Sequence, residues 1–327
     1  MMNEMSAAQG LLVSTPALRH RVSPLHLHPY CPPLHPLLNC LFGSTNSSYD
    51  ATPSAEVLEL LPLLLQLPLG RRSAASGTFL EIGANDGMTG STTLLLERCL
   101  GWRGLLIEGS THTYEQLERA PRTAKRIHSA VCANASGGTV RFSKSDTSTV
   151  NLAFEQVGRD TVSMWADHWH VLNRSHFEEV PCAPLAKLMS DHGFDEIDFL
   201  SLDVQGAESV VLNTVDPRRF GMVLVESEAN NRASNDKVDA VLRRADFKQL
   251  PLTIHRLGYK GYNRVYVSAS RHVQDIRPAH PGEVYVHGLR AAKHGDYYLQ
   301  NQTLQTSAAE RRAWLTRALS NTSGCVV

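Results

Sequence analysis

Two acidic residues and a glycine-rich turn have the types and spacing of a ligand-binding group. Glu81 lies in the apolar run 79–82, and the turn GANDG follows directly over 83–87. Glu108 ends a second apolar run, 104–108. A carboxylate beside the turn suits a cationic amino group, and one at the next strand end suits both hydroxyls of a ribose. S-adenosylmethionine presents these groups and has no phosphate, so it is the predicted cofactor.

The turn distinguishes this cofactor from a dinucleotide. A dinucleotide-binding turn reads Gly-x-Gly-x-x-Gly, and its second glycine lets a pyrophosphate approach the backbone. Here Asn85 takes that second position, and the acidic Glu81 before the turn repels a diphosphate. The predicted contacts with the cofactor are therefore Gly83, Ala84, Asn85 and Gly87. A structural turn in another kind of α/β protein is the alternative that this motif leaves open.

Two further carboxylates are placed to act on the acceptor of a methyl group. Asp203 ends the apolar strand 197–203, and Glu226 ends the strand 223–226. Methyl transfer to a hydroxyl needs a base for its proton, and parallel strands present their carboxyl ends at one sheet edge. Asp203 is the predicted base or acceptor-orienting residue and Glu226 the second catalytic candidate. Capping of the next helix is the alternative role for Asp203, and no metal is predicted, although Glu208 lies nearby.

An α/β fold would bring these residues together. Apolar runs predict strands, which lie at 79–82, 104–108, 126–132, 139–143, 180–182, 197–203 and 223–226. Helical patterns lie between them, at 89–100, 111–120, 185–192, 207–214 and 236–245. The runs 247–255 and 264–267 predict a closing antiparallel hairpin. We therefore expect a Rossmann-like sandwich, with a mostly parallel central sheet and helices on both faces.

Three separated motifs resemble one family in the order in which they occur. They read FLEIGANDGMTGSTTLLLERCLGWRGLLIEGSTHTYEQL, then IDFLSLDVQGAE from Ile197, then MVLVE from Met222. Over about residues 77–268 the chain resembles the FkbM-type S-adenosylmethionine-dependent methyltransferases. The resemblance implies a class I methyltransferase sandwich and adenine contacts at Ser129 and Ala130. It also implies O-methylation, often of a sugar or other secondary-metabolite hydroxyl.

One position departs from the family pattern. The second motif usually reads Asp-Val-Glu-Gly, and here its third residue is Gln205. A methyltransferase-like binding module without catalysis is therefore an alternative to the enzyme. A dinucleotide-dependent oxidoreductase is another alternative, which Asn85 disfavours.

The chain divides into four parts. Residues 1–50 are an extension, 51–76 an N-terminal helix and linker, 77–268 the methyltransferase domain, and 269–327 a C-terminal extension with a helical pattern at 308–319. The first part has no acidic residue between positions 4 and 50 and many prolines, which predicts a disordered extension or a transit peptide. The leucine-rich helix of the second part is expected to cover the sheet.

Composition narrows the choice of partners. Lys and Arg number 32 and Asp and Glu number 32, so we expect no nucleic-acid partner and instead a small-molecule or glycan acceptor. The most apolar stretch, 58–69, is interrupted by Glu59, Pro62, Gln66 and Pro68, so no transmembrane segment is predicted. The expected location is soluble, either cytoplasmic or organellar.

Three features remain without an assigned role. The 6 cysteines show no metal-binding spacing, so buried thiols are expected. Five Asn-x-Ser/Thr sequons begin at Asn46, Asn134, Asn173, Asn301 and Asn321, and their use is left open. The irregular stretch 144–177, which carries two tryptophans, is either a substrate lid or a surface excursion.

Overall fold

The computed structural model describes residues 77–134, 136–144, 177–228, 231–255 and 261–269. It also describes positions 40, 57, 60, 61, 64, 153, 156 and 157 and a small hairpin of β11 (Leu289–Ala291) and β12 (Tyr297–Leu299). Several predictions concern residues outside this description, namely the extension 1–50 apart from position 40, most of the stretch 144–177, the helix 308–319, and the sequons at Asn46, Asn173, Asn301 and Asn321.

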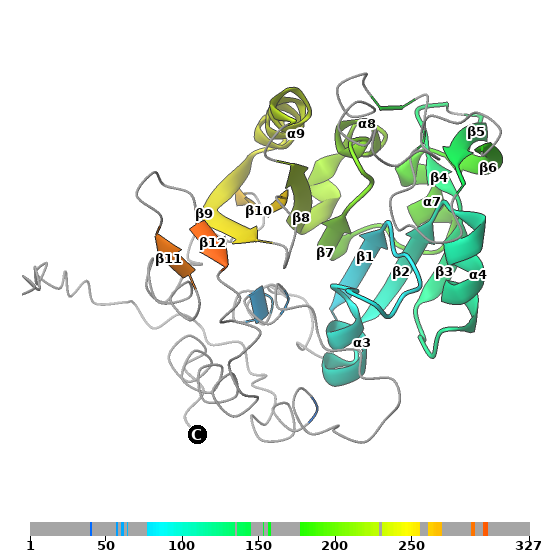
Figure 1. Cartoon of the computed structure of the whole chain (residues 1–327), viewed down its shortest axis with the longest axis horizontal. Helices are drawn as coiled ribbons and strands as arrows, with labels where there is room; N and C mark the ends of the chain where they lie inside the picture. The colour runs from blue at the N-terminus through cyan, green and yellow to red at the C-terminus, as the bar shows by residue number, and fades with distance from the viewer. Residues whose placement is uncertain are drawn as a thin grey trace, which may run out of the picture.

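A seven-stranded sheet runs through the centre of the described chain (Figure 1). Its strand order is β3-β2-β1-β7-β8-β10-β9. The strands are β1 (Thr78–Ile82), β2 (Arg103–Glu108), β3 (Lys125–His128), β7 (Ile197–Leu202), β8 (Phe220–Glu228), β9 (Phe247–His255) and β10 (Gly261–Ser268). The first five are parallel, and β10 runs antiparallel to both β8 and β9. This arrangement confirms the predicted mostly parallel sheet with a closing hairpin.

Helices cover both faces of the sheet. On one face the buried core includes residues of α3 (Leu94–Leu100) and α4 (Thr111–Arg119). On the other it includes residues of α7 (Leu185–Asp191), α8 (Glu208–Leu212) and α9 (Arg232–Arg244). Successive strand residues point to opposite faces, so the neighbours Phe79 and Leu80 enter different cores. A single turn of 3₁₀ helix, η3 (Pro217–Arg219), leads into β8.

The leucine-rich N-terminal segment packs where the sequence predicts. Val57, Leu60, Leu61 and Leu64 are helical and buried in the core that also contains Phe79. Their spacing of three and four residues places them on one side of a helix. These four positions therefore pack against one face of the sheet, as the sequence predicts.

The strand predicted at 126–132 is wrong as a single element. The chain breaks at Ser129, so that β3 belongs to the central sheet and β4 (Ala130–Val131) to a second sheet, with the order β4-β6-β5. β4 pairs with β6 (Phe177–Ala183), and β6 pairs in turn with β5 (Gly138–Ser143). Ser129 N still donates to Glu108 O at 3.0 Å, while its hydroxyl donates to Pro181 O at 3.1 Å. The residue thus joins two sheets, which an apolar run cannot reveal.

Two disulfides correct the expectation of buried thiols. Cys132 is bonded to Cys182, and Cys40 to Cys99. The partners are 50 and 59 residues apart in sequence, so no local spacing could have paired them. The part of the chain that the structure describes contains no free cysteine. It also contains no helix that is both long and apolar enough to cross a membrane.

Candidate active site

The site lies at the carboxyl edge of the sheet, where the strand order reverses. Ile82 of β1 is level with Ile107 of β2 on one side and with Leu202 of β7 on the other. The residues that follow these strand ends therefore meet at one place. Open α/β sheets bind ligands at such a reversal. A cavity of about 300 Å³ opens here, at the lower end of the size range of ligand sites.

Most of the predicted site residues line this cavity. They are Glu81, Gly83, Ala84, Asn85, Glu108, Ser129 and Ala130 from the cofactor set and both catalytic candidates, Asp203 and Glu226. Gly87 is the exception. It has a φ of +73°, and a Cβ there would lie 2.4 Å from Leu117 Cδ1 of α4, so this glycine faces the helix rather than the cavity.

The glycine turn packs directly against the neighbouring strand end. Gly83 has a φ of +80°, and a Cβ on it would lie 1.9 Å from Asp203 O, so no side chain fits there. Gly83 N and Ala84 N both donate to Ile107 O, at 3.0 and 3.1 Å. Asn85 also takes a left-handed conformation, with a φ of 52°. The turn is therefore held on both sides by the strands that flank β1.

Glu108 ties the turn to β2. Its Oε2 accepts from Asn85 N and its Oε1 from Ser110 N, each at 2.8 Å. The side chain is buried, and burial raises the pKa of the Glu108 carboxyl, although these backbone N–H groups oppose that rise. The carboxylate thus stands at the cavity wall in a defined orientation.

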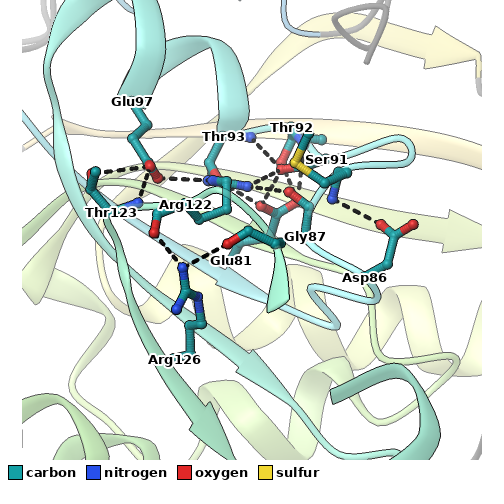
Figure 2. Close-up of polar contacts among 12 residues, drawn as sticks. Glu81, Asp86, Gly87, Ser91, Thr92, Thr93, Glu97, Arg122, Thr123 and Arg126 are labelled. Atoms are coloured by element: carbon teal, nitrogen blue, oxygen red, sulfur yellow. Dashed lines mark hydrogen bonds and ion pairs between the residues drawn. The ribbon is translucent and has the colours of Figure 1, made fainter. Parts of the chain in front are cut away.

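Glu81 organises the segment that follows the turn. Its Oε2 accepts from Ser91 Oγ at 2.7 Å and Thr93 Oγ1 at 2.5 Å, and its Oε1 from Thr92 N at 2.9 Å and Thr92 Oγ1 at 3.2 Å (Figure 2). These bonds draw residues 91–93 toward the carboxylate, and α3 begins only at Leu94, not at position 89 as predicted. Glu81 therefore has a structural role beside its predicted contact with the cofactor amine, which stays a prediction.

A buried arginine that the sequence analysis missed supports the same segment. Arg122 Nε donates to Glu97 Oε2 at 2.9 Å, and its Nη1 donates to Gly87 O at 2.5 Å and Ser91 Oγ at 3.0 Å. Its Nη2 donates to Thr93 Oγ1 at 2.9 Å (Figure 2). The Arg122 and Glu97 side chains are 0% and 5% exposed. No motif marks Arg122 in the sequence, because its partners lie 25 to 35 residues away.

A glutamine joins the two catalytic candidates on the other side of the cavity. Gln205 Nε2 donates to Asp203 Oδ1 at 2.7 Å and to Glu226 Oε2 at 2.9 Å. Gln205 has a φ of 55°, a strained conformation for this residue type. Its Oε1 is buried and has no hydrogen-bond partner within the described residues. In the sequence this position is a departure from the family pattern, but no sequence feature places its side chain between the two carboxylates.

Glu208 holds the loop that carries Asp203 and Gln205. Its Oε1 accepts from Gly206 N at 2.9 Å and from Val204 N at 3.2 Å. Burial, with a smaller contribution from the Asp203 charge, raises the pKa of Glu208 to about 7, against the effect of the two N–H groups. Glu208 does not line the cavity, and the described chain contains no group of three or more His, Cys, Asp or Glu able to hold a metal ion.

The cavity has the chemistry that S-adenosylmethionine requires. Its lining includes the acidic side chains Glu81 and Glu108 and an apolar part formed by Ile107, Val131, Phe142 and Leu202. Besides Gln205 Oε1, the lining contains another buried polar atom, Gln156 Nε2, that has no hydrogen-bond partner among the described residues. A ligand that brings both a donor and an acceptor would satisfy this atom and Gln205 Oε1.

Comparison with known proteins also indicates a methyltransferase. Residues 81–260 match the family described as "Methyltransferase FkbM domain". No curated protein matches the sequence significantly.

Solved structures of methyltransferases resemble the fold at low identity. A methyltransferase FkbM from Methylobacillus flagellatus KT is 14% identical, with a TM-score of 0.37, over 71% of this chain and 58% of that one. Precorrin-6y C5,15-methyltransferase from Geobacter metallireducens GS-15 is 8% identical, with a TM-score of 0.36, over 69% and 94% of the two chains. A mutant of MtNAS in complex with S-adenosylmethionine is 13% identical, with a TM-score of 0.33, over 72% and 71%. Likenesses this distant assign no substrate.

Proposed function

Because this chain belongs to the FkbM methyltransferase family, whose methyl donor is S-adenosylmethionine, we propose that it methylates a hydroxyl oxygen of a small-molecule or glycan acceptor. The observation that carries the proposal is the group of Asp203, Gln205 and Glu226 at the cavity wall. It offers carboxylate oxygens and one unpaired amide oxygen, Gln205 Oε1. Such a set of hydrogen-bond acceptors suits a ligand that presents several O–H donors, as a sugar does.

In the proposed mechanism, one side of the cavity binds the cofactor and the other side binds and deprotonates the acceptor. S-adenosylmethionine supplies a methyl group on a positively charged sulfur, which is already electrophilic, so the protein chiefly aligns the acceptor and takes its proton. With the cofactor bound, Glu108 would accept hydrogen bonds from its ribose hydroxyls, the backbone of 83–85 would lie against it, and Glu81 would attract its ammonium group. Asp203 takes the proton from the acceptor hydroxyl as the oxygen bonds to the methyl carbon. The S–CH₃ bond would break as the O–CH₃ bond forms, which would leave S-adenosylhomocysteine, a methyl ether and a protonated Asp203.

Gln205 has a positioning role in this proposal. One nitrogen donates to both carboxylates, so it keeps an oxygen of each within reach of the same point and lowers their mutual repulsion. Its left-handed backbone is held by the Glu208 bonds to Val204 N and Gly206 N on either side. The strain is consistent with a residue whose side chain must reach a set position.

The test is a methyl-transfer assay on matched acceptors. The full chain would be incubated with labelled S-adenosylmethionine and a panel of sugars, other alcohols, amines and carboxylic acids. We expect label on hydroxyl acceptors. Calorimetry with S-adenosylhomocysteine and with NAD would run in parallel, and only the former should bind. Binding of S-adenosylhomocysteine without transfer to any acceptor would support the non-catalytic alternative that Gln205 raises. Transfer to amines alone would show that the acceptor class is wrong.

A further inference from the structure

One sequon lies in the described part of the domain, on an exposed turn between β4 and β5. The side chain of Asn134 is exposed, and its main-chain O accepts from Gly137 N at 2.9 Å. Its Oδ1 accepts from Ser136 N at 3.2 Å, so the asparagine and the serine of the sequon lie in one tight turn. Asn134 does not line the cavity. A bulky group on this residue would therefore leave the candidate active site open.

The surrounding cysteine chemistry points to an oxidising compartment. Cys132, two residues before Asn134, is bonded to Cys182 of β6, and a second disulfide joins Cys40 to Cys99 of α3. Structural disulfides persist in secretory and extracellular compartments and are rare in the cytosol. Asparagine-linked glycans are a modification of secreted proteins at Asn-x-Ser/Thr sequons. Two independent features, the disulfides and the exposed sequon, thus lead to the same compartment.

We propose that Asn134 is an N-glycosylation site and that this domain matures in an oxidising secretory compartment. The amide nitrogen Nδ2 would displace the pyrophosphate from the anomeric carbon of a lipid-pyrophosphate-linked oligosaccharide. A C–N bond forms, the C–O bond to the pyrophosphate breaks, one amide proton is lost, and the lipid pyrophosphate leaves. This inference does not rest on the proposed O-methylation, and of the two locations expected from the sequence, cytoplasmic or organellar, it favours the second.

The geometry of the turn is compatible with the attached glycan. Asn134 Nδ2 donates to Gly137 O at 2.6 Å, its one hydrogen bond as a donor within the described residues. A side-chain amide carries two N–H groups, and a glycosylated one keeps a single N–H. That remaining N–H can still donate to Gly137 O, and Oδ1 can still accept from Ser136 N. The turn therefore keeps its bonds after modification.

The experiment detects N-glycosylation and disulfide bonds in the same protein preparation. The full chain would be expressed in a eukaryotic secretory host, with a leader added so that entry into the lumen is assured. Treatment with peptide N-glycosidase in heavy-oxygen water converts each glycosylated asparagine to labelled aspartate, which peptide mass spectrometry locates. We expect label at Asn134 and a disulfide-linked peptide that contains Cys132 and Cys182. Asn213 is exposed but begins no sequon, so its peptide serves as an internal blank.

Two matched variants test whether modification of Asn134 depends on its sequon. Ser136→Ala removes the sequon and keeps Asn134, so the label at Asn134 should disappear. Ser136→Thr keeps the sequon, so the label should remain. An unlabelled Asn134 in the wild-type protein overturns the site, whether or not another sequon such as Asn321 is labelled. Free thiols at Cys132 and Cys182 in that preparation overturn the inferred compartment.

Discussion

Two groups of side chains beside the cavity, Glu81 with Glu97 and Arg122, and Gln205 with Asp203 and Glu226, differ in how completely their buried polar atoms are paired. On the β1–β2 side, the buried side-chain oxygen and nitrogen atoms of Glu81, Glu97 and Arg122 all have partners (Figure 2). On the β7–β8 side, Gln205 donates to two carboxylates but leaves its own Oε1 buried and unpaired in the described chain. Both sides are acidic, so charge alone does not distinguish them.

This difference bears on what each side can do. A fully paired buried network is rigid, because any movement breaks several bonds at once. A buried unpaired oxygen costs about 1–3 kcal/mol, a cost that a ligand donor removes on binding. The contrast agrees with our proposal that the first side is ready for the cofactor and that the second is completed by the acceptor. Five substitutions test this contrast.

The largest effect is expected from Arg122→Met. Loss of the guanidinium leaves Glu97 buried without a counter-charge and removes three further bonds to the turn segment. The free energy of unfolding, measured in urea, should fall by about 3–5 kcal/mol. Arg119→Met is the control, because Arg119 and its partner Glu115 are 78% and 57% exposed, and it should change stability by less than about 1 kcal/mol. Equal effects of the two changes would show that the network does not stabilise the fold.

Asp203→Asn should separate catalysis from cofactor binding. The amide keeps the shape of the side chain but cannot take a proton, so turnover should fall by about a hundredfold or more. The affinity for S-adenosylhomocysteine, measured by calorimetry, should change little. Asp191→Asn, in the exposed pair with Lys187, is the matched control. Wild-type turnover in the Asp203 variant would remove Asp203 as the base and make Glu226 the next residue to test.

Glu108→Ala should weaken cofactor binding. The change removes the proposed acceptor of the ribose hydroxyls and the bond that orients Asn85 N. Affinity for S-adenosylhomocysteine should fall by about 1–3 kcal/mol in binding free energy. Circular dichroism would confirm that the variant is folded, and the exposed Glu118→Ala is the control. Unchanged affinity in folded protein would mean that Glu108 serves the turn alone.

Gln205→Glu should change the pH dependence of turnover. A third carboxylate beside Asp203 and Glu226 raises the pKa of the group through like-charge repulsion, so the base loses its proton at a higher pH than in the wild-type protein. The change restores the residue that the family motif usually has at this position, so the enzyme should stay active while the pH of half-maximal turnover shifts upward by about one unit. A uniform loss at every pH would indicate a steric effect instead. An unchanged pH profile would mean that Gln205 does not act on the carboxylates.

The last substitution concerns Glu208, where the smallest change per pH unit is expected. Burial raises the pKa of its carboxyl from 4.5 to about 7, so between these values the folded state holds a proton that the unfolded state has released. The stability of the wild-type protein should fall as the pH rises through this window, by up to about 1 kcal/mol per pH unit from this group. Glu208→Gln should remove that part of the slope in urea unfolding measured at several pH values. Parallel curves for the two proteins would refute this account.

The sequence by itself determined the elements that build the site. The apolar runs of β1, β2 and β7 and the glycine turn between Gly83 and Gly87 are local features, and the structure has strands over the three runs and a tight turn at the glycines. Strand patterns are reliable here because strands buried on both faces must be apolar throughout. The order of the runs also predicted that Glu108 and Asp203 reach the same edge of the sheet, as they do.

Only the tertiary structure decided how those elements are joined. The partners of Arg122, the bridge from Gln205 to Glu226 across 21 residues, and both disulfides depend on strand order and register. The break at Ser129 arises because the residues before it pair in the central sheet and the residues after it pair in the second sheet. Local periodicity reports which side of an element is apolar, but it carries no information about which distant residue faces it. That is why the sequence predicted the carboxylates of this site but not the arginine and the glutamine that hold them.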